Sequence, residues 1–92
     1  MNFPQIAQQV IDKLGGKENI ATAAHCATRL RIVLNDESKV DKEGIDNIEG
    51  LKGQFAVAGQ YQIIFGSGTV NKVHAELTKL LGIGDVSKAE VA

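Results

Sequence analysis

Residues 20–34 give the clearest indication of the fold, and they read Ile20-Ala21-Thr22-Ala23-Ala24-His25-Cys26-Ala27-Thr28-Arg29-Leu30-Arg31-Ile32-Val33-Leu34. Residues 29–34 combine β-branched residues with partial alternation, which is typical of a half-buried strand. Residues 20–24 are less strongly strand-like because alanine is a poor strand former. If both parts are strands, residues 25–28 form a short connection, and short connections join antiparallel strands. The stretch therefore predicts a strand pair with Cys26 at the connection, where backbone N–H groups are free to face a ligand.

A helix is predicted before this strand pair, because apolar residues recur there at the spacing of a helix with one buried face. Asn2 can cap this helix, and Pro4 fits its first turn, where a missing N–H costs nothing. Gly15-Gly16 then ends it. The apolar stripe consists of Phe3, Ile6, Ala7, Val10, Ile11 and Leu14.

The second half of the chain predicts another helix and two more strands. Residues 41–48 are interpreted as a short helix over the sheet, and residues 54–58 and 61–65 as strands. Gly59-Gln60 between them is a candidate two-residue hairpin turn. Short connections within both strand pairs favour an α+β fold with a four-stranded, mainly antiparallel sheet and about three helices packed on one face.

A last helix is predicted from the apolar residues that follow residues 66–69, and Gly82 ends it. The loop Gly66-Ser67-Gly68-Thr69 is interpreted as a tight turn in which Thr69 or Ser67 caps the helix. As a nucleotide loop it lacks the third glycine, since position 71 is Asn71, and it lacks the Gly-Lys-Ser/Thr ending of a P-loop.

Composition narrows the class of protein. The 92 residues suffice for one domain, and 43% apolar with 23% charged residues indicates a globular rather than a disordered chain. A net charge of −1 disfavours a nucleic-acid binder, and a single cysteine excludes an internal disulfide framework. No apolar run is long enough to cross a bilayer, and no secretory signal is predicted. We therefore expect a cytoplasmic domain over residues 1–82, with residues 83–92 as the start of a linker.

Cys26 is the candidate reactive residue. Arginine charges and unpaired backbone N–H groups lower the pKa of a thiol and favour its nucleophilic thiolate form. Arg29 and Arg31 follow closely, and alternation places both on one face of their strand, so both could address one anion. Arginine offers a planar fork that matches the oxygens of a phosphoryl group. From the residues alone, a small buried cysteine and a merely solvated strand face stay open as alternatives.

Other arrangements of the same residues are less well supported. His25 and Cys26 are neighbours in an extended chain, so their side chains are expected on opposite faces, which argues against a Cys–His nucleophilic pair. A zinc site built from His25, Cys26 and His74 lacks the spacing of known ligand sets, and His74 is interpreted as an ordinary helix residue. The sequence thus predicts no metal and no cofactor.

The motif Cys26-Ala27-Thr28-Arg29-Leu30-Arg31 resembles that of a known family. It is similar to the B domain (EIIB) of glucose-superfamily enzyme II, from the bacterial phosphoenolpyruvate-dependent sugar phosphotransferase system, whose members carry Cys-x-Thr-Arg-Leu-Arg. The resemblance covers about residues 5–82. It includes Gly15-Gly16 with Asn19-Ile20, Gly50-Leu51-Lys52-Gly53, residues 59–66 and residues 68–73.

The resemblance implies roles for individual residues. Cys26 would become a phosphocysteine, and Arg29 and Arg31 match paired arginines that support transfer to sugar. The amides of the turn, Ala27 among them, and Thr28 would hold the phosphoryl oxygens. The remaining implied phosphate-binding positions, in a loop expected beside the cysteine, are Gly59 and Gln60.

The resemblance also implies an activity and partners. Cys26 would accept phosphate from a phosphohistidine of a glucose-type A protein or domain (EIIA). It would then pass the phosphate to a sugar held by a membrane-embedded C domain (EIIC), which makes the chain part of a protein-phosphohistidine–sugar phosphotransferase. The domain itself would lie at the cytoplasmic face of the cell membrane, without inserting into the bilayer and without binding nucleic acid. Sucrose-specific members look most similar, and trehalose-specific members come next.

Two other classes of function stay open. In the first, an EIIB-like module is fused to a regulator and phosphorylation of Cys26 is a signal. In the second, Cys26 serves a redox or thiol enzyme, although the chain has no Cys-x-x-Cys partner for it.

Overall fold

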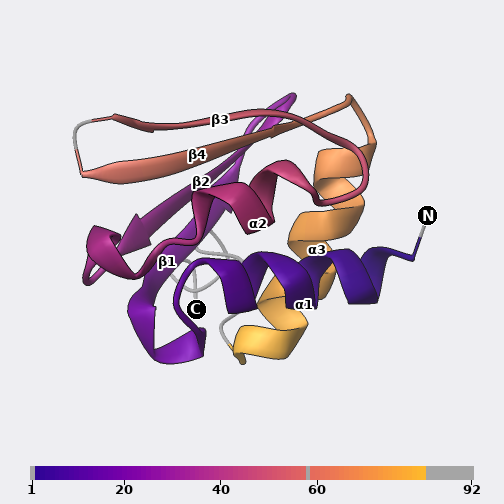
Figure 1. The fold of residues 1–92 in the computed structure, drawn as a ribbon. Coiled ribbons are helices and arrows are strands. Elements are labelled where there is room, and N and C mark those ends of the chain that lie inside the picture. Colours follow the sequence, from indigo (N-terminus) through magenta and orange to yellow (C-terminus); the bar gives the residue numbers. More distant parts are fainter. Residues whose placement is uncertain (1, 58, 83–92) are drawn as a thin grey trace.

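The computed structural model describes residues 2–57 and 59–82. Four strands form one antiparallel sheet in the order β1-β2-β4-β3, and the predicted sequence of helices and strands is confirmed (Figure 1). The elements are α1 (Phe3–Lys13), the 3₁₀ turn η1 (Lys17–Asn19), β1 (Ile20–His25), β2 (Arg29–Leu34), the 3₁₀ turn η2 (Glu37–Lys39), α2 (Lys42–Asp46), β3 (Leu51–Val57), β4 (Gln60–Phe65) and α3 (Thr69–Leu81).

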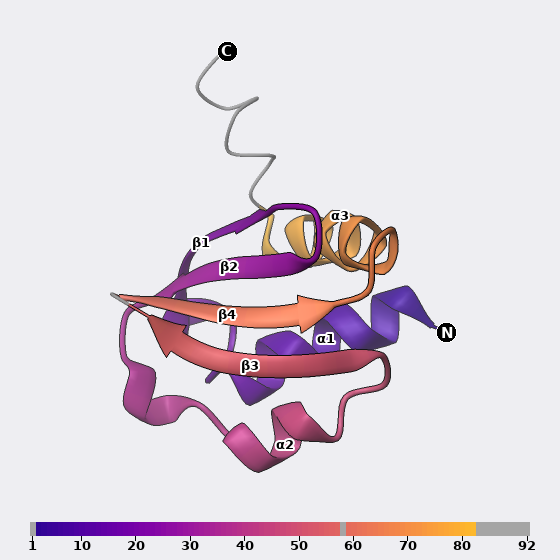
Figure 2. The ribbon, with the colours of Figure 1, turned by 90° about the horizontal axis from the view of Figure 1, so that it is seen from above.

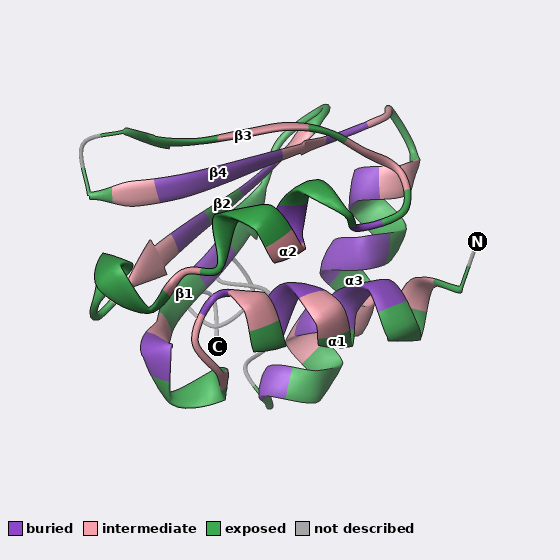
Figure 3. Cartoon of the chain, in the orientation of Figure 1, coloured by how far each residue is buried: buried purple, intermediate pink, exposed green. Residues whose placement is uncertain are grey.

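The helices cover one face of the sheet and leave the other face open. In the view from above, α1 lies behind the strands and no helix passes in front of them (Figure 2). Alternation along β2 and β4 sends one set of side chains into the core between sheet and helices, and buried segments of α1 and α3 face it (Figure 3). The predicted α+β class is confirmed. The inward-facing strand residues are Leu30, Ile32, Tyr61, Ile63 and Phe65, all at most 2% exposed.

Helix α1 begins and ends where the sequence predicts. The Asn2 side chain accepts a hydrogen bond from the Gln5 backbone N–H at 3.1 Å, and Pro4 stands in the first turn. The helix ends before Gly15, whose φ of 101° lies in the left-handed region that glycine adopts without strain. A methyl group at Gly15 would approach the Asn19 side chain to 2.8 Å.

Asn19 joins the end of α1 to the start of β1 and the end of β2. Its buried amide nitrogen donates to the carbonyl oxygens of Leu14 at 2.7 Å and Asp36 at 2.8 Å. The side-chain oxygen of Asn19, Oδ1, accepts a hydrogen bond from the Asp36 backbone N–H at 2.8 Å. One side chain thus satisfies three backbone groups, and buried backbone groups left unsatisfied are costly.

We expect Asn19→Ala to lower the free energy of unfolding by about 2–3 kcal/mol, because it leaves these three backbone groups without their hydrogen-bond partner. Urea denaturation checks this value. Asn35→Ala is the matched control, since exposed Asn35 makes a single hydrogen bond from its side chain, to the Glu18 carbonyl oxygen. Equal destabilisation by the two substitutions would contradict the role given to Asn19.

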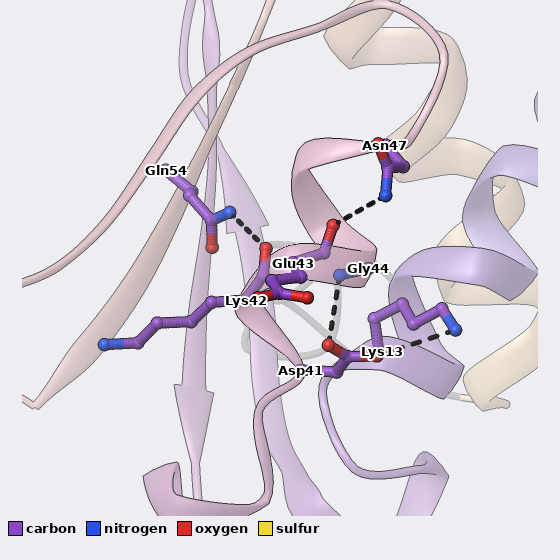
Figure 4. A network of polar contacts seen from close by, with 7 residues as sticks. All are labelled: Lys13, Asp41, Lys42, Glu43, Gly44, Asn47 and Gln54. Atoms are coloured by element: carbon purple, nitrogen blue, oxygen red, sulfur yellow. Dashed lines mark hydrogen bonds and ion pairs between the residues drawn. The ribbon is translucent and has the colours of Figure 1, made fainter.

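Helix α2 is short and is fixed from both sides (Figure 4). The Asp41 carboxylate accepts from the Gly44 N–H at 3.0 Å and pairs with Lys13 of α1 at 3.7 Å. On the other side, the Gln54 amide of β3 donates to the Lys42 carbonyl oxygen at 2.8 Å. These contacts attach α2 to α1 and to the edge strand of the sheet.

Three details differ from the sequence-based expectation. Strand β3 begins at Leu51 rather than at residue 54, because the glycine at position 53 lies inside the strand at a register shift. The hairpin turn lies one residue earlier than predicted, since Gln60 already pairs with Val57.

The predicted cap of α3 is wrong as well. Gly68, with a φ of 83°, occupies the cap position, and neither Ser67 nor Thr69 provides a side-chain cap there. The carbonyl oxygens of Gly66 and Gly68 accept the helical bonds from Val70 and Lys72 instead.

Candidate functional site

Cys26 lies on a tight turn that the fold holds at both ends. Its N–H donates to the Arg29 carbonyl oxygen at 3.0 Å, which closes the β1–β2 hairpin. The Thr28 carbonyl oxygen accepts from the Phe65 N–H at 2.8 Å, which ties the turn to the end of β4. The thiol itself is exposed, so the alternative of a buried structural cysteine is wrong. The turn therefore presents the Cys26 thiol at the surface and is held by backbone hydrogen bonds to β2 and β4.

The surroundings of Cys26 lower the pKa of its thiol. The largest cause is the Thr28 backbone N–H, followed by the Arg29 backbone N–H. Desolvation opposes them, and the Arg31 side chain makes smaller contributions, by hydrogen bonding and by its charge, that lower the pKa further. Donors that stabilise a thiolate also suit the oxygens of a phosphoryl group on the same sulfur.

We expect Arg31→Gln to raise the pKa of Cys26, because it removes the positive side chain near the sulfur. Thiolate is the species that reacts with iodoacetamide, so the midpoint of the rate-against-pH curve should move to higher pH. Arg29→Gln is the matched control and should move the midpoint less, because the Arg29 guanidinium has partners elsewhere. A midpoint unmoved by Arg31→Gln would contradict this arrangement.

The two arginines share a face but have different partners. The Arg31 side chain lowers the pKa of the Cys26 thiol. Arg29 Nη1 instead donates to Gln62 Oε1 at 2.8 Å, and its Cζ lies 5.1 Å from the centroid of the Phe55 ring. Neither Gln62 nor Phe55 was among the predicted site residues. The available signal was Gln62, a polar residue inside the apolar run of β4.

The His25 side chain contacts α3, and its Nδ1 lies 3.4 Å from the backbone carbonyl oxygen of Cys26. Its ring packs against that of His74 of α3, with centroids 4.2 Å apart, and His74 Nε2 lies 3.3 Å from the Ala23 carbonyl oxygen. The side chain of His25 thus contacts the helical layer, whereas Cys26 shares the open face with Arg31. The expectation that no Cys–His pair forms agrees with this geometry.

Gly59 and Gln60 do not lie beside the cysteine. Strand β4 runs antiparallel to β2, so Gln60 pairs with Val33, while Arg29 beside the cysteine turn pairs with Ile64. Four residues of strand, roughly 13 Å, separate these two pairs. The two hairpin turns accordingly stand at opposite ends of the sheet (Figure 2).

Within the described residues, no group of three or more His, Cys, Asp or Glu side chains is placed to hold a metal ion. In the same part of the chain, no helix is long and apolar enough to cross a membrane.

Known proteins resemble this chain in sequence and in fold. A family model described as "phosphotransferase system, EIIB" matches residues 8–41. The chain is 78% identical, over all of its 92 residues, to the sucrose-specific EIIBC component of Pasteurella multocida, and it covers 19% of that protein. It is 56% identical over 85 residues to the trehalose-specific EIIBC component of Bacillus subtilis, covering 92% of this chain and 18% of the relative.

A solved structure agrees with these relatives. One domain of the phosphotransferase system IIabc component from Clostridium difficile superposes with a TM-score of 0.81 at 41% identity, covering 85% of this chain and 81% of that one. The chain belongs to the EIIB family of the phosphotransferase system. It spans about a fifth of the length of the curated relatives.

Proposed function

We propose that this chain is the phosphoryl carrier of a sugar transporter, in which Cys26 accepts a phosphoryl group from a phosphohistidine of EIIA and passes it to a sugar held by EIIC. The observation that carries the proposal is the exposed thiol of Cys26, whose pKa is lowered by two backbone N–H groups and by Arg31. Phosphoryl transfer needs an in-line nucleophile and stabilisation of charge more than it needs proton chemistry.

In the first transfer, the Cys26 thiolate attacks the phosphorus of the phosphohistidine. The sulfur–phosphorus bond forms while the phosphorus–nitrogen bond breaks, and the imidazole nitrogen leaves with the electron pair. The N–H groups of Thr28 and Arg29, which lower the pKa of the thiol, can donate to the phosphoryl oxygens. The amide of Ala27 belongs to the same turn. The Arg31 guanidinium can stabilise the negative charge of the phosphoryl group.

In the second transfer, a hydroxyl oxygen of the sugar attacks the same phosphorus. The oxygen–phosphorus bond forms, the sulfur–phosphorus bond breaks, and the thiolate leaves with the electron pair. The hydroxyl proton passes to a base supplied by the sugar-binding partner. A thiolate of lowered pKa is a good leaving group, so the environment that favours acceptance also favours release.

Both partners must reach Cys26 from outside, and the open face of the sheet gives them room. Two large apolar side chains are exposed on this face: Phe55, at 37% exposure, lies beside Arg29, and Val57, at 44%, lies nearer the β3–β4 turn. We expect them to contact EIIA, EIIC or both. The domain would span residues 1–82 and work at the cytoplasmic face of the membrane, with residues 83–92, which lie outside the described residues, leading towards EIIC.

Sucrose is the proposed sugar, with trehalose as the alternative. The support is the printed specificity of relatives, with sucrose at 78% and 59% identity against trehalose at 56%. In a reconstituted relay, label from phosphoenolpyruvate should reach sucrose only when this chain, EIIA and a sucrose-type EIIC are all present. Labelling of trehalose instead, with a trehalose-type EIIC, would indicate that this chain serves a trehalose transporter. Labelling of Cys26 without transfer to either sugar would favour a regulatory module.

A further inference from the structure

We infer that Gln62 is a positioning residue, which together with Phe55 holds the Arg29 guanidinium in a resting place from which phosphorylation of Cys26 withdraws it. The inference rests on the proposed function, because it assigns the second transfer a side chain that the resting site keeps elsewhere. Its core observation is that Arg29 contacts Gln62 and Phe55, on two other strands.

The strand register explains how the three residues meet. Phe55 of β3 pairs with Gln62 of β4, which in turn pairs with Arg31 of β2. Arg29 stands two residues along β2 from Arg31, on the same face. Its side chain therefore runs diagonally towards β3, away from the β1 side of the hairpin that carries Cys26.

Gln62 is built into this face. It is only 7% exposed, although the helices leave this side of the sheet uncovered. Its Oε1 accepts from Arg29, and its Nε2 lies 3.4 Å from Gln60 Oε1, which orients the amide with the oxygen towards the guanidinium. A buried amide oriented by its neighbours gives Arg29 a defined partner.

The contacts of Arg29 with Gln62 and Phe55 are weaker than the contact that a phosphoryl group can offer. Gln62 is a neutral acceptor, and Phe55 offers only the weak field of its ring face at a partly exposed site. A phosphoryl group adds between one and two negative charges and can accept a bidentate pair from a guanidinium, which is the stronger interaction. Cys26 and Arg29 flank the same turn, joined by a 3.0 Å backbone hydrogen bond, so the new charge appears within reach of Arg29.

Because Arg29 rests on Gln62 and Phe55, the two arginines act at different stages of the transfer. The Arg31 side chain favours the thiolate before phosphorylation, whereas the Arg29 guanidinium joins only after the charge of the phosphoryl group has arrived. An Arg29 held too firmly should therefore leave acceptance intact and slow the second transfer. Gln62→Glu creates such a hold, because a carboxylate in place of the amide forms a charge-assisted pair with the guanidinium.

The first test follows the Arg29 side chain by NMR in this chain before and after phosphorylation by EIIA. The Phe55 ring should shift the Arg29 side-chain protons upfield, and Phe55→Leu should remove that shift and so assign it. In phosphorylated wild type the upfield shift should be lost. If Cys26 is phosphorylated and the Arg29 shift persists, the inference is wrong; if Cys26 takes no phosphate, the proposed function fails instead.

The second test compares the two transfer rates. Gln62→Glu should change acceptance from EIIA by less than about twofold and slow transfer to sugar, in vesicles that carry EIIC, by about tenfold, or about 1.4 kcal/mol. Gln62→Leu, which has no acceptor, should not slow that second transfer. Gln5→Glu adds the same charge on exposed α1 and controls for net charge. Equal slowing by Gln62→Glu and Gln62→Leu would indicate a merely structural residue.

Discussion

Replacement of Cys26 by serine should abolish phosphoryl acceptance while leaving the fold intact. A serine hydroxyl is hardly ionised at neutral pH, so the N–H groups and Arg31 that stabilise a thiolate have no anion to act on. We expect the rate of label uptake from phosphorylated EIIA to fall at least about 1000-fold. A quench-flow assay with labelled phosphoenolpyruvate measures this rate.

The fold should tolerate the substitution because Cys26 is exposed and its backbone bond to Arg29 is retained. An unchanged melting temperature is therefore the control that separates lost chemistry from lost structure. Label uptake by Cys26→Ser at the wild-type rate would show that the phosphoryl group goes elsewhere on the chain.

Replacement of Arg29 by lysine should slow transfer to sugar much more than acceptance from EIIA. Lysine keeps the charge but loses the planar fork that can hold two oxygens of a phosphoryl group. Removal of one well-placed donor typically costs about 100-fold in a transfer step. Acceptance should change by only a few fold, because the resting Arg29 side chain contacts Gln62 and Phe55.

Arg31→Lys is the natural comparison for this prediction. Arg31 acts on the thiol, so its substitution should affect acceptance as well as transfer. Separate single-turnover rates for charging by EIIA and discharge to sugar measure the two steps. Loss of both steps to the same extent in Arg29→Lys would overturn the division of roles.

The fold and the turn that carries Cys26 could be predicted because their signals are local. The alternation around Leu30 and Ile32 and the short connection at Cys26 identify a hairpin without any knowledge of the remaining chain. The spacing from Phe3 to Leu14 identifies α1 in the same way. Each of these elements is observed, and the turn exposes Cys26 as expected.

The rest of the site depends on register between strands that are distant in sequence. The sequence does not reveal that β4 lies next to β2 and antiparallel to it, which places Gln60 far from the cysteine and Phe65 beside the turn. For the same reason the contacts of Arg29 with Gln62 and Phe55 could not be foreseen. The glycine cap of α3 was not predicted, because the side chain of Ser67 or Thr69 was expected to cap this helix. In the structure Gly68, which has a positive φ, occupies the cap position.

Whether Cys26 carries the phosphoryl group is tested by the intact mass of the chain after incubation with phosphoenolpyruvate, the general phosphotransfer proteins and a glucose-type EIIA. We predict the mass of one added phosphoryl group, located at Cys26 by peptide mapping and absent from Cys26→Ser. An unchanged mass with a competent EIIA, or a phosphoryl group on another residue, would contradict the assignment of Cys26 as the phosphoryl carrier.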